Sequence, residues 1–153
     1  MYSHILIATD GSDFAQRGVD HGLALAATHG SRVTVLHVTE IFPVYAARPE
    51  FENVSVVETM ALYRRAGKEF AEQVLAAAAE AAKARGVACE TVHVDQVRPA
   101  EAIVEVARDR GCDLIVMTSH GASHGRRGHD RAFLGSQAVE VLTTSPVPVL
   151  VVR

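Results

Sequence analysis

The sequence predicts an α/β fold, a three-layer sandwich in which four helices cover a five-stranded parallel sheet. Short runs rich in β-branched residues alternate along the chain with longer stretches whose apolar residues recur at helical spacing. Glycines, prolines and capping residues stand at the ends of those stretches. The length of 153 residues, of which 48% are hydrophobic and 22% charged, suits a single globular domain over residues 1–153.

Five short segments are the predicted strands. They are HILIATD (4–10), RVTVLHV (32–38), ACETVHV (88–94), DLIVMTS (113–119) and VPVLVV (147–152). The first, fourth and fifth are almost continuous in Ile, Leu and Val, as expected of parallel strands that are covered on both faces. The third alternates between polar and apolar residues, which places it nearer an edge.

Four helices with recognisable ends lie between these strands. The first begins near Ser12 and ends at Gly30, and it buries Phe14, Val19, Leu23 and Ala26. The second opens with the capping box Ser55 to Glu58, and its apolar face continues to Gly86 through Met60, Gly67, Ala71, Val74 and Ala78. Pro99 suits the first turn of the third, and Ser136 opens the fourth, which ends before Pro146.

We expect the strands in the order 3-2-1-4-5, with right-handed crossovers. This order makes the first and fourth strands neighbours and puts the reversal of the chain between them, where ligands bind in open α/β sheets. Two unusual stretches follow these two strands, ATDGS after the first and the glycine-rich run 118–136 after the fourth. Both are therefore predicted to line one crevice at the carboxyl edge of the sheet.

Each stretch admits two interpretations. The carboxylate of Asp10 either accepts hydrogen bonds from a ribose or an exocyclic amine, or caps the helix that begins near Ser12. The glycines from Gly121 to Gly135 either let backbone amides approach a phosphate at a helix N-terminus, or form a plain connection. The run contains no lysine and neither the P-loop nor the dinucleotide-binding glycine pattern.

Metal binding by the histidines of this run is not expected. The glycines between His120, His124 and His129 deny them a fixed helical face, and no cysteine or well-placed carboxylate completes a ligand set. The arginines of the run either pair with Asp130 on a solvated loop or reach phosphates. The remaining histidines are interpreted as surface residues of strands and helices; they are His4, His21, His29, His37 and His93.

Composition excludes several classes of protein. A net charge of −3 argues against a nucleic-acid binder, and no apolar run is long enough to cross a membrane. Cys89 and Cys112 are expected to be buried free thiols, and no signal peptide is recognisable, so a cytoplasmic location is expected. Segment 39–53 is long for a connection and aromatic, and is interpreted as a lid, a partner surface or a packed flap.

Taken together, ILIATDGS, VTVLHV, DLIVMTSHG and SPVPVLVVR resemble the universal stress protein family in its UspA-like single-domain form, over essentially the whole chain. The resemblance implies a Rossmann-like, adenine nucleotide α-hydrolase-like fold. The ATP-binding branch carries G-x2-G-x9-G-[ST], and Gly125 with Gly135-Ser136 reproduces its second half. The first glycine is replaced by Ala122, or by Thr118 if the repeated Ser-His-Gly is a four-residue insertion.

The resemblance implies an adenine nucleotide (ATP, ADP or AMP) as ligand, with Mg²⁺ as a possible companion. Matched by position, the base and ribose would be held by Ala8, Thr9, Asp10 and Val38, and the sugar would also lie beside Met117 and Thr118. The phosphates would be held by Gly125, Gly135, Ser136 and Gln137. Gly121 and Ala122 are also expected among the nucleotide-binding residues, with Ala122 or Thr118 near the sugar. Asp10 and Asp130 are the nearby candidates to assist Mg²⁺.

These observations favour a nucleotide-binding stress or regulatory module over two alternatives. A slow nucleotide hydrolase or transferase is disfavoured because the run lacks the Walker lysine and a metal-holding carboxylate pair. The other alternative is an interaction protein that binds no nucleotide. The resemblance also implies a homodimer through strand 147–152, which would cover an apolar sheet edge that segment 39–53 could otherwise cover.

Overall fold

A computed structural model of the chain describes residues 1–41, 55–119 and 134–153. The elements alternate as predicted. They are β1 (His4–Ala8), α1 (Asp13–His29), β2 (Arg32–Thr39), α2 (Val56–Ala84), β3 (Cys89–Asp95), α3 (Pro99–Asp109), β4 (Leu114–Thr118), α4 (Ser136–Thr144) and β5 (Val149–Val152). The strands form one sheet in the order β3-β2-β1-β4-β5, and every neighbouring pair is parallel. The predicted fold class, order and edge position of the third strand are confirmed.

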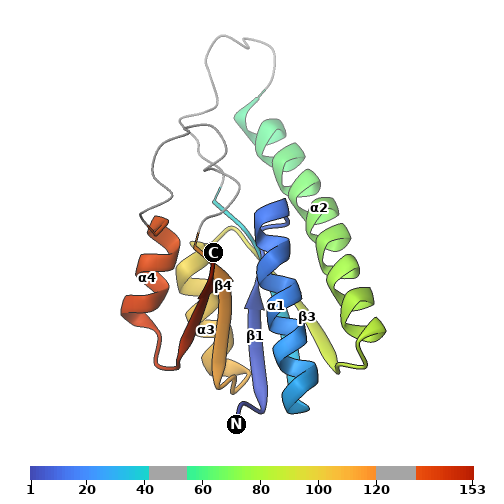
Figure 1. Cartoon of the computed structure of the whole chain (residues 1–153). Helices are drawn as coiled ribbons and strands as arrows, with labels where there is room; N and C mark the ends of the chain where they lie inside the picture. Colours follow the sequence, from blue (N-terminus) through green and yellow to red (C-terminus); the bar gives the residue numbers. More distant parts are fainter. Residues whose placement is uncertain (42–54, 120–133) are drawn as a thin grey trace.

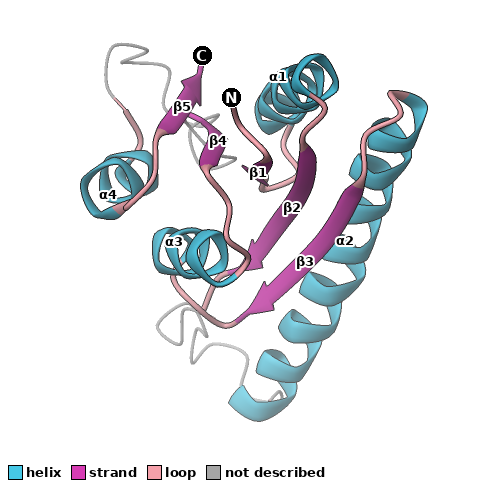
Figure 2. Cartoon of the chain, turned by 90° about the horizontal axis from the view of Figure 1, so that it is seen from below, coloured by secondary structure: helices cyan, strands magenta, loops and turns pink. Residues whose placement is uncertain are grey.

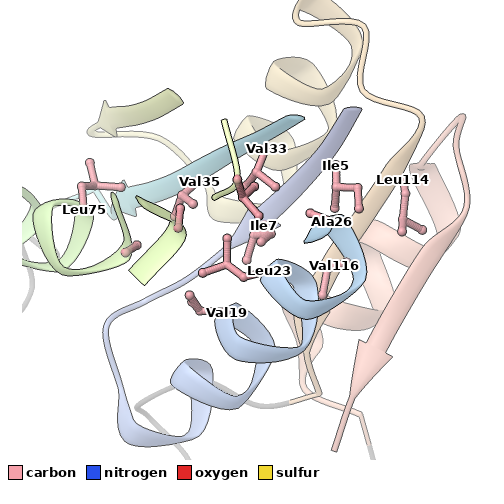
Figure 3. Close-up of a cluster of buried hydrophobic side chains, with 13 residues drawn as sticks. Ile5, Ile7, Val19, Leu23, Ala26, Val33, Val35, Leu75, Leu114 and Val116 are labelled. Atoms are coloured by element: carbon pink, nitrogen blue, oxygen red, sulfur yellow. The ribbon is translucent and has the colours of Figure 1, made fainter. Parts of the chain in front are cut away.

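Helices cover both faces of this sheet. Figures 1 and 2 show α1 and α2 on one face and α3 and α4 on the other. Ile5 and Ile7 of β1 belong to a core cluster with Leu23 of α1, whereas Leu6 belongs to a second cluster with Ile103 of α3. Figure 3 shows the first cluster, in which β1 contributes two of the central side chains. Alternate residues of β1 therefore pack on opposite layers, which explains its continuous apolar sequence.

The helix ends follow the predicted chemistry. The Ser12 hydroxyl accepts from the amide of Ala15 at the start of α1, and Gly30 ends that helix in the left-handed region at φ 66°. Ser55 and Glu58 form the full capping box of α2. Pro99 occupies the first turn of α3. The predicted boundary signals at Ser12, Gly30, Ser55 and Pro99 are therefore used in the structure.

Some burial predictions were wrong. Phe14 is only partly buried, because it lies at the first turn of α1 with the Arg17 guanidinium 5.5 Å from its ring. Cys112 is buried, but Cys89 is half-buried on an edge strand, and both thiols are free. His4 and His37 were interpreted as surface residues, yet only 4% and 5% of each is exposed.

Among residues 1–41, 55–119 and 134–153, no helix has the length and hydropathy needed to cross a membrane. Segment 39–53 was interpreted as a lid, a partner surface or a packed flap, and all of it beyond residue 41 lies outside the described residues. Residues 120–133, within the glycine-rich run, also lie outside them.

Candidate functional site

The turn after β1 and the end of β4 lie at the same edge of the sheet. Strands β1 and β4 are direct neighbours, with Ile7 paired with Val116. Both strands run in the same direction, so their carboxyl ends meet where the chain order reverses (Figure 1). The structure thus brings the Asp10 turn together with Thr118 and the beginning of the glycine-rich run.

The β1–α1 turn is held by its own side chains. The amide of Gly11 donates to the Thr9 hydroxyl over 3.2 Å, and the amide of Ser12 donates to Oδ1 of Asp10 over 3.0 Å. The N-cap of α1 is Ser12, so Asp10 does not cap the helix. Its carboxylate instead closes a short turn one step earlier. Asp10 remains partly exposed, so its carboxylate is accessible at the carboxyl edge.

Gly11 is required at this turn for two reasons. Its φ of +78° is a conformation that residues with a Cβ rarely adopt. A Cβ at this position would also come within 2.5 Å of Cγ2 of Val74 and 2.8 Å of Cζ of Phe70, both in α2. The turn that carries Asp10 is consequently packed directly against α2.

The N-terminus of α4 lies close to the end of β4. The amide of Gly135 donates to the carbonyl of Ser119 over 2.8 Å, and the amide of Ser119 donates to the carbonyl of Val152 over 3.0 Å. Gly135 is the N-cap residue of α4, and a glycine has no side chain of its own with which to accept from the first amides of the helix. The first amides of α4 and the positive end of its dipole therefore suit an anion.

The side chain of Gln137, in α4, is hydrogen-bonded to the first turn of α3. Its side-chain oxygen accepts from the amide of Ala100, over 2.9 Å, in the first turn of α3. Arg98, the N-cap residue of α3, forms an ion pair with Glu140 of α4, in which Nη2 donates to both carboxylate oxygens over 2.9 and 2.8 Å. The N-terminal turns of α3 and α4 are thus braced together, and Gln137 contributes to this brace through its oxygen.

Four of the other predicted site residues lie within the described part of the chain, and three lie outside it. Met117 and Thr118 are 6% and 8% exposed at the end of β4, where Thr118 packs against Gly18 of α1. Ala8 and Val38 are partly buried and pack on the cluster formed with α3 and α4. Gly121, Ala122 and Gly125 lie outside the described residues. So do the three histidines of the glycine-rich run and Asp130.

Within the described ranges, no group of three or more His, Cys, Asp or Glu side chains could hold a metal ion. Asp10 is the one predicted Mg²⁺-assisting residue that these ranges contain. A single carboxylate suits Mg²⁺ only when nucleotide phosphates and water supply the other ligands.

Sequence reasoning missed His37. Its Nδ1 lies 3.0 Å from the carbonyl oxygen of Thr9, next to Asp10. Burial lowers the pKa of His37 below its ordinary value, and the nearby His93 lowers it further, while the bond to Thr9 opposes the shift. A signal was present, because His37 occupies the same face of β2 as the buried Val33 and Val35.

A comparison with known proteins agrees with this fold. The model of the universal stress protein family matches residues 1–153. The chain belongs to the universal stress protein family. A universal stress protein of Thermus aquaticus is 42% identical over 153 residues, which is the full length of both chains.

Solved structures of this family are also similar. One, of a Methanocaldococcus jannaschii universal stress protein, has a TM-score of 0.77 and 30% identity and covers 99% of this chain and 96% of its own. Another is a universal stress protein in complex with cAMP, with a TM-score of 0.66 and 26% identity, covering 99% of this chain and 97% of its own. Binding of an adenine nucleotide thus occurs within the family.

Proposed function

We propose that this universal stress protein binds an adenine nucleotide (ATP, ADP or AMP) at the carboxyl edge of its sheet and acts as a stress-response or regulatory module. The observation that carries the proposal is the position of the α4 N-terminus, whose N-cap residue Gly135 is hydrogen-bonded to Ser119 at the end of β4. The backbone amides at the α4 N-terminus can bind an anion, and they lie beside the end of β4. The partly exposed carboxylate of Asp10 follows the neighbouring strand β1. This pairing suits a ligand with phosphates at one end and hydrogen-bonding hydroxyls or amines at the other.

Each described residue has a proposed role. Asp10 accepts hydrogen bonds from ribose or base, and Thr9, whose hydroxyl oxygen accepts from the amide of Gly11, contributes the donor of that hydroxyl. Ala8 and Val38 border the base, and Met117 and Thr118 border the sugar. The amides of Gly135 and Ser136 take the phosphates, and the Gln137 amide group adds a donor while its oxygen stays on Ala100.

Binding rather than rapid catalysis is the proposed role. Among the described residues, no lysine stands at a proposed phosphate position, and no group of three or more His, Cys, Asp or Glu side chains could hold a metal ion. Phosphoryl transfer needs such positioned charge. Hydrolysis of ATP should therefore stay well below about 1 per second, the lower end of ordinary enzyme turnover.

The proposed partner is a second copy of the chain, paired through strand β5, and the proposed location is the cytoplasm. Strand β5 lies at the end of the strand order, and its four residues are only partly buried. Two free thiols suit a reducing compartment. We propose no nucleic-acid partner, because the net charge is −3.

Calorimetric titration of the purified, nucleotide-free protein with ATP, ADP, AMP and cAMP tests the proposed ligand. Saturable binding of one molecule per chain is expected for at least one of them. GTP is the matched control, because it carries the same phosphates on a different base. Failure of all four adenine nucleotides to bind would contradict the proposal.

A further inference from the structure

His37 makes a buried side-chain contact to the β1–α1 turn, which carries Asp10. Its Nδ1 lies 3.0 Å from the carbonyl oxygen of Thr9, and 5% of the residue is exposed. A carbonyl oxygen only accepts hydrogen bonds, so Nδ1 must carry the hydrogen. In its neutral form, therefore, His37 is the Nδ1–H tautomer.

Rings from α2 and β3 lie against the imidazole of His37. The ring of Phe70, in α2, meets it edge-on at 5.6 Å between centroids, and the ring of His93, in β3, lies at 6.0 Å. His93 is itself held through Nε2, which lies 2.8 Å from the hydroxyl oxygen of Thr39. Phe70 also borders Gly11, so α2 holds both the ring of His37 and the turn to which it bonds.

The bond from His37 orients the backbone of Asp10. The carbonyl of Thr9 and the amide of Asp10 belong to one planar peptide unit, so fixing that carbonyl fixes the plane that precedes Asp10. The amide of Thr9 is bound in turn to the carbonyl of Leu36 over 2.9 Å. Thr9 is thus held to β2 on both sides, by the backbone of Leu36 and by the side chain of His37.

We propose that His37 is a positioning residue for nucleotide binding, which acts by holding the Thr9–Asp10 peptide in the orientation that presents Asp10 at the carboxyl edge. His37 does not touch the nucleotide in this arrangement. The inference rests on the proposed adenine-nucleotide function. It requires a hydrogen-bond donor at this position, because a ring of the same size without a donor fills the space but leaves the carbonyl of Thr9 unheld.

Two substitutions distinguish the effect of the hydrogen-bond donor of His37 from the effect of its aromatic ring. In His37→Asn the side-chain amide occupies the place of Nδ1–H and can still donate to Thr9, whereas His37→Phe keeps an aromatic ring beside Phe70 and has no donor. Affinity for ATP, measured by calorimetry, should fall about three- to tenfold in His37→Phe, as expected for one lost hydrogen bond. His37→Asn should recover most of that loss.

His4 offers a matched control at the opposite edge of the sheet. It is 4% exposed, and its Nδ1 donates to the carbonyl of Arg110 over 3.1 Å, so it has the same chemistry as His37 away from the proposed site. The variant His4→Phe should lose stability, as His37→Phe does, but keep the affinity of the wild type. This comparison separates a loss of binding from a general loss of stability.

Imidazole nitrogen shifts give a second readout that a purely structural role would not change. In ¹⁵N-labelled protein, His37 should show the Nδ1–H pattern, and its signals should shift with ATP along the same saturation curve as the calorimetric titration. Those of His4 should stay in place. If the wild type binds ATP but His37→Phe binds equally well, or if the signals of His37 do not respond, the positioning role is wrong. If the wild type binds no adenine nucleotide, the proposed function itself fails, and this inference fails with it.

Discussion

The amide nitrogen of Gly135 lies 2.8 Å from the carbonyl oxygen of Ser119, so the N-cap residue of α4 is tied directly to the end of β4. Ser119 is 2% exposed and is bound in turn to Val152 of the neighbouring strand. The proposed phosphate site is therefore anchored in the sheet. Its N-cap residue, Gly135, has no side chain that could occupy the first amides of α4.

Replacing Gly135 with Asp should separate stability from nucleotide binding. The φ of −63° and ψ of 153° at this position are accessible to any residue, and Asp is a favoured N-cap. The free energy of unfolding should rise by a few tenths of a kcal/mol. Affinity for ATP should fall at least tenfold, because the carboxylate competes for the α4 amides and repels phosphate.

Gly135→Asn is the control for this experiment, since it caps the helix without adding charge. Its affinity should lie between those of the wild type and Gly135→Asp. Calorimetry of the three proteins at one ionic strength, with unfolding followed by circular dichroism, makes the comparison. Equal ATP affinity in Gly135→Asp and the wild type would show that the phosphates bind elsewhere.

Asp10→Asn should show whether the carboxylate serves the nucleoside or a magnesium ion. The amide oxygen of Asn can still accept from Ser12, which keeps the turn, and can still accept from a ribose hydroxyl. ATP affinity without Mg²⁺ should therefore change less than about threefold, because no hydrogen bond is lost outright. A larger loss confined to titrations that contain Mg²⁺ would instead assign Asp10 to the metal. Asp10→Ala, which loses both the turn bond and the acceptor, should bind more weakly in either condition.

The stability of the protein should fall as the pH drops below 6.5. Burial and the charge of Arg32 lower the pKa of His4 below its ordinary value of 6.5, whereas the bond to Arg110 opposes the shift. His4 is neutral in both states well above pH 6.5. As the pH falls through 6.5 the unfolded chain takes up the proton first, so the free energy of unfolding decreases. Burial of His37 acts in the same direction.

His4→Asn tests the share of this effect that comes from His4. The variant should be less stable at pH 7 by about 1 kcal/mol, because Nε2 of His4 accepts from the hydroxyl of Thr34 over 2.8 Å and Asn leaves that group without its partner. Its stability should nevertheless decline less between pH 6.5 and 5, since it has lost one buried titrating group. Urea unfolding at several pH values measures both slopes, and parallel slopes would refute the assignment.

The fold could be predicted because local signals and the global pattern agree. The helix ends at Ser12, Gly30 and Ser55 carry chemistry that acts within one turn, so a single sequence reveals them. The parallel sheet followed from the alternation of strands and helices, and the expected strand order was confirmed. Only strand bounds moved, as at β1, which ends at Ala8 because the Asp10 turn has already begun.

The site was less predictable, because its geometry depends on contacts between distant residues. The sequence left open whether Asp10 caps α1, and the bond from Ser12 decides that it closes a turn instead. Gln137 was expected at the phosphates, but whether its oxygen instead reaches Ala100 depends on how α3 and α4 pack. His37 was wrongly interpreted as a surface residue, because histidine is polar. Its position on the buried face of β2 would have predicted burial.

The backbone of β5 shows how a dimer could form without disturbing the fold. The carbonyls of Pro148 and Val152 accept from Ile115 and Ser119, on the side of β4. Successive residues of a strand point their backbone groups to opposite sides, so those of Val149 and Val151 point to the outer edge. An antiparallel copy of β5 would pair through these groups.

Val151→Pro should therefore abolish the proposed dimer and spare the monomer. Proline removes an amide from the outer edge of β5, a position at which sheets tolerate it, and leaves the amides that face β4 in place. Leu150→Pro is the contrasting control, because residue 150 faces β4 and the loss of its amide should weaken the fold itself. Light scattering coupled to size exclusion, at micromolar concentration, should show a dimeric wild type and a monomeric, folded Val151→Pro. A wild type that is monomeric under these conditions would exclude the dimer, and a Val151→Pro variant that remains dimeric would place the interface on another surface.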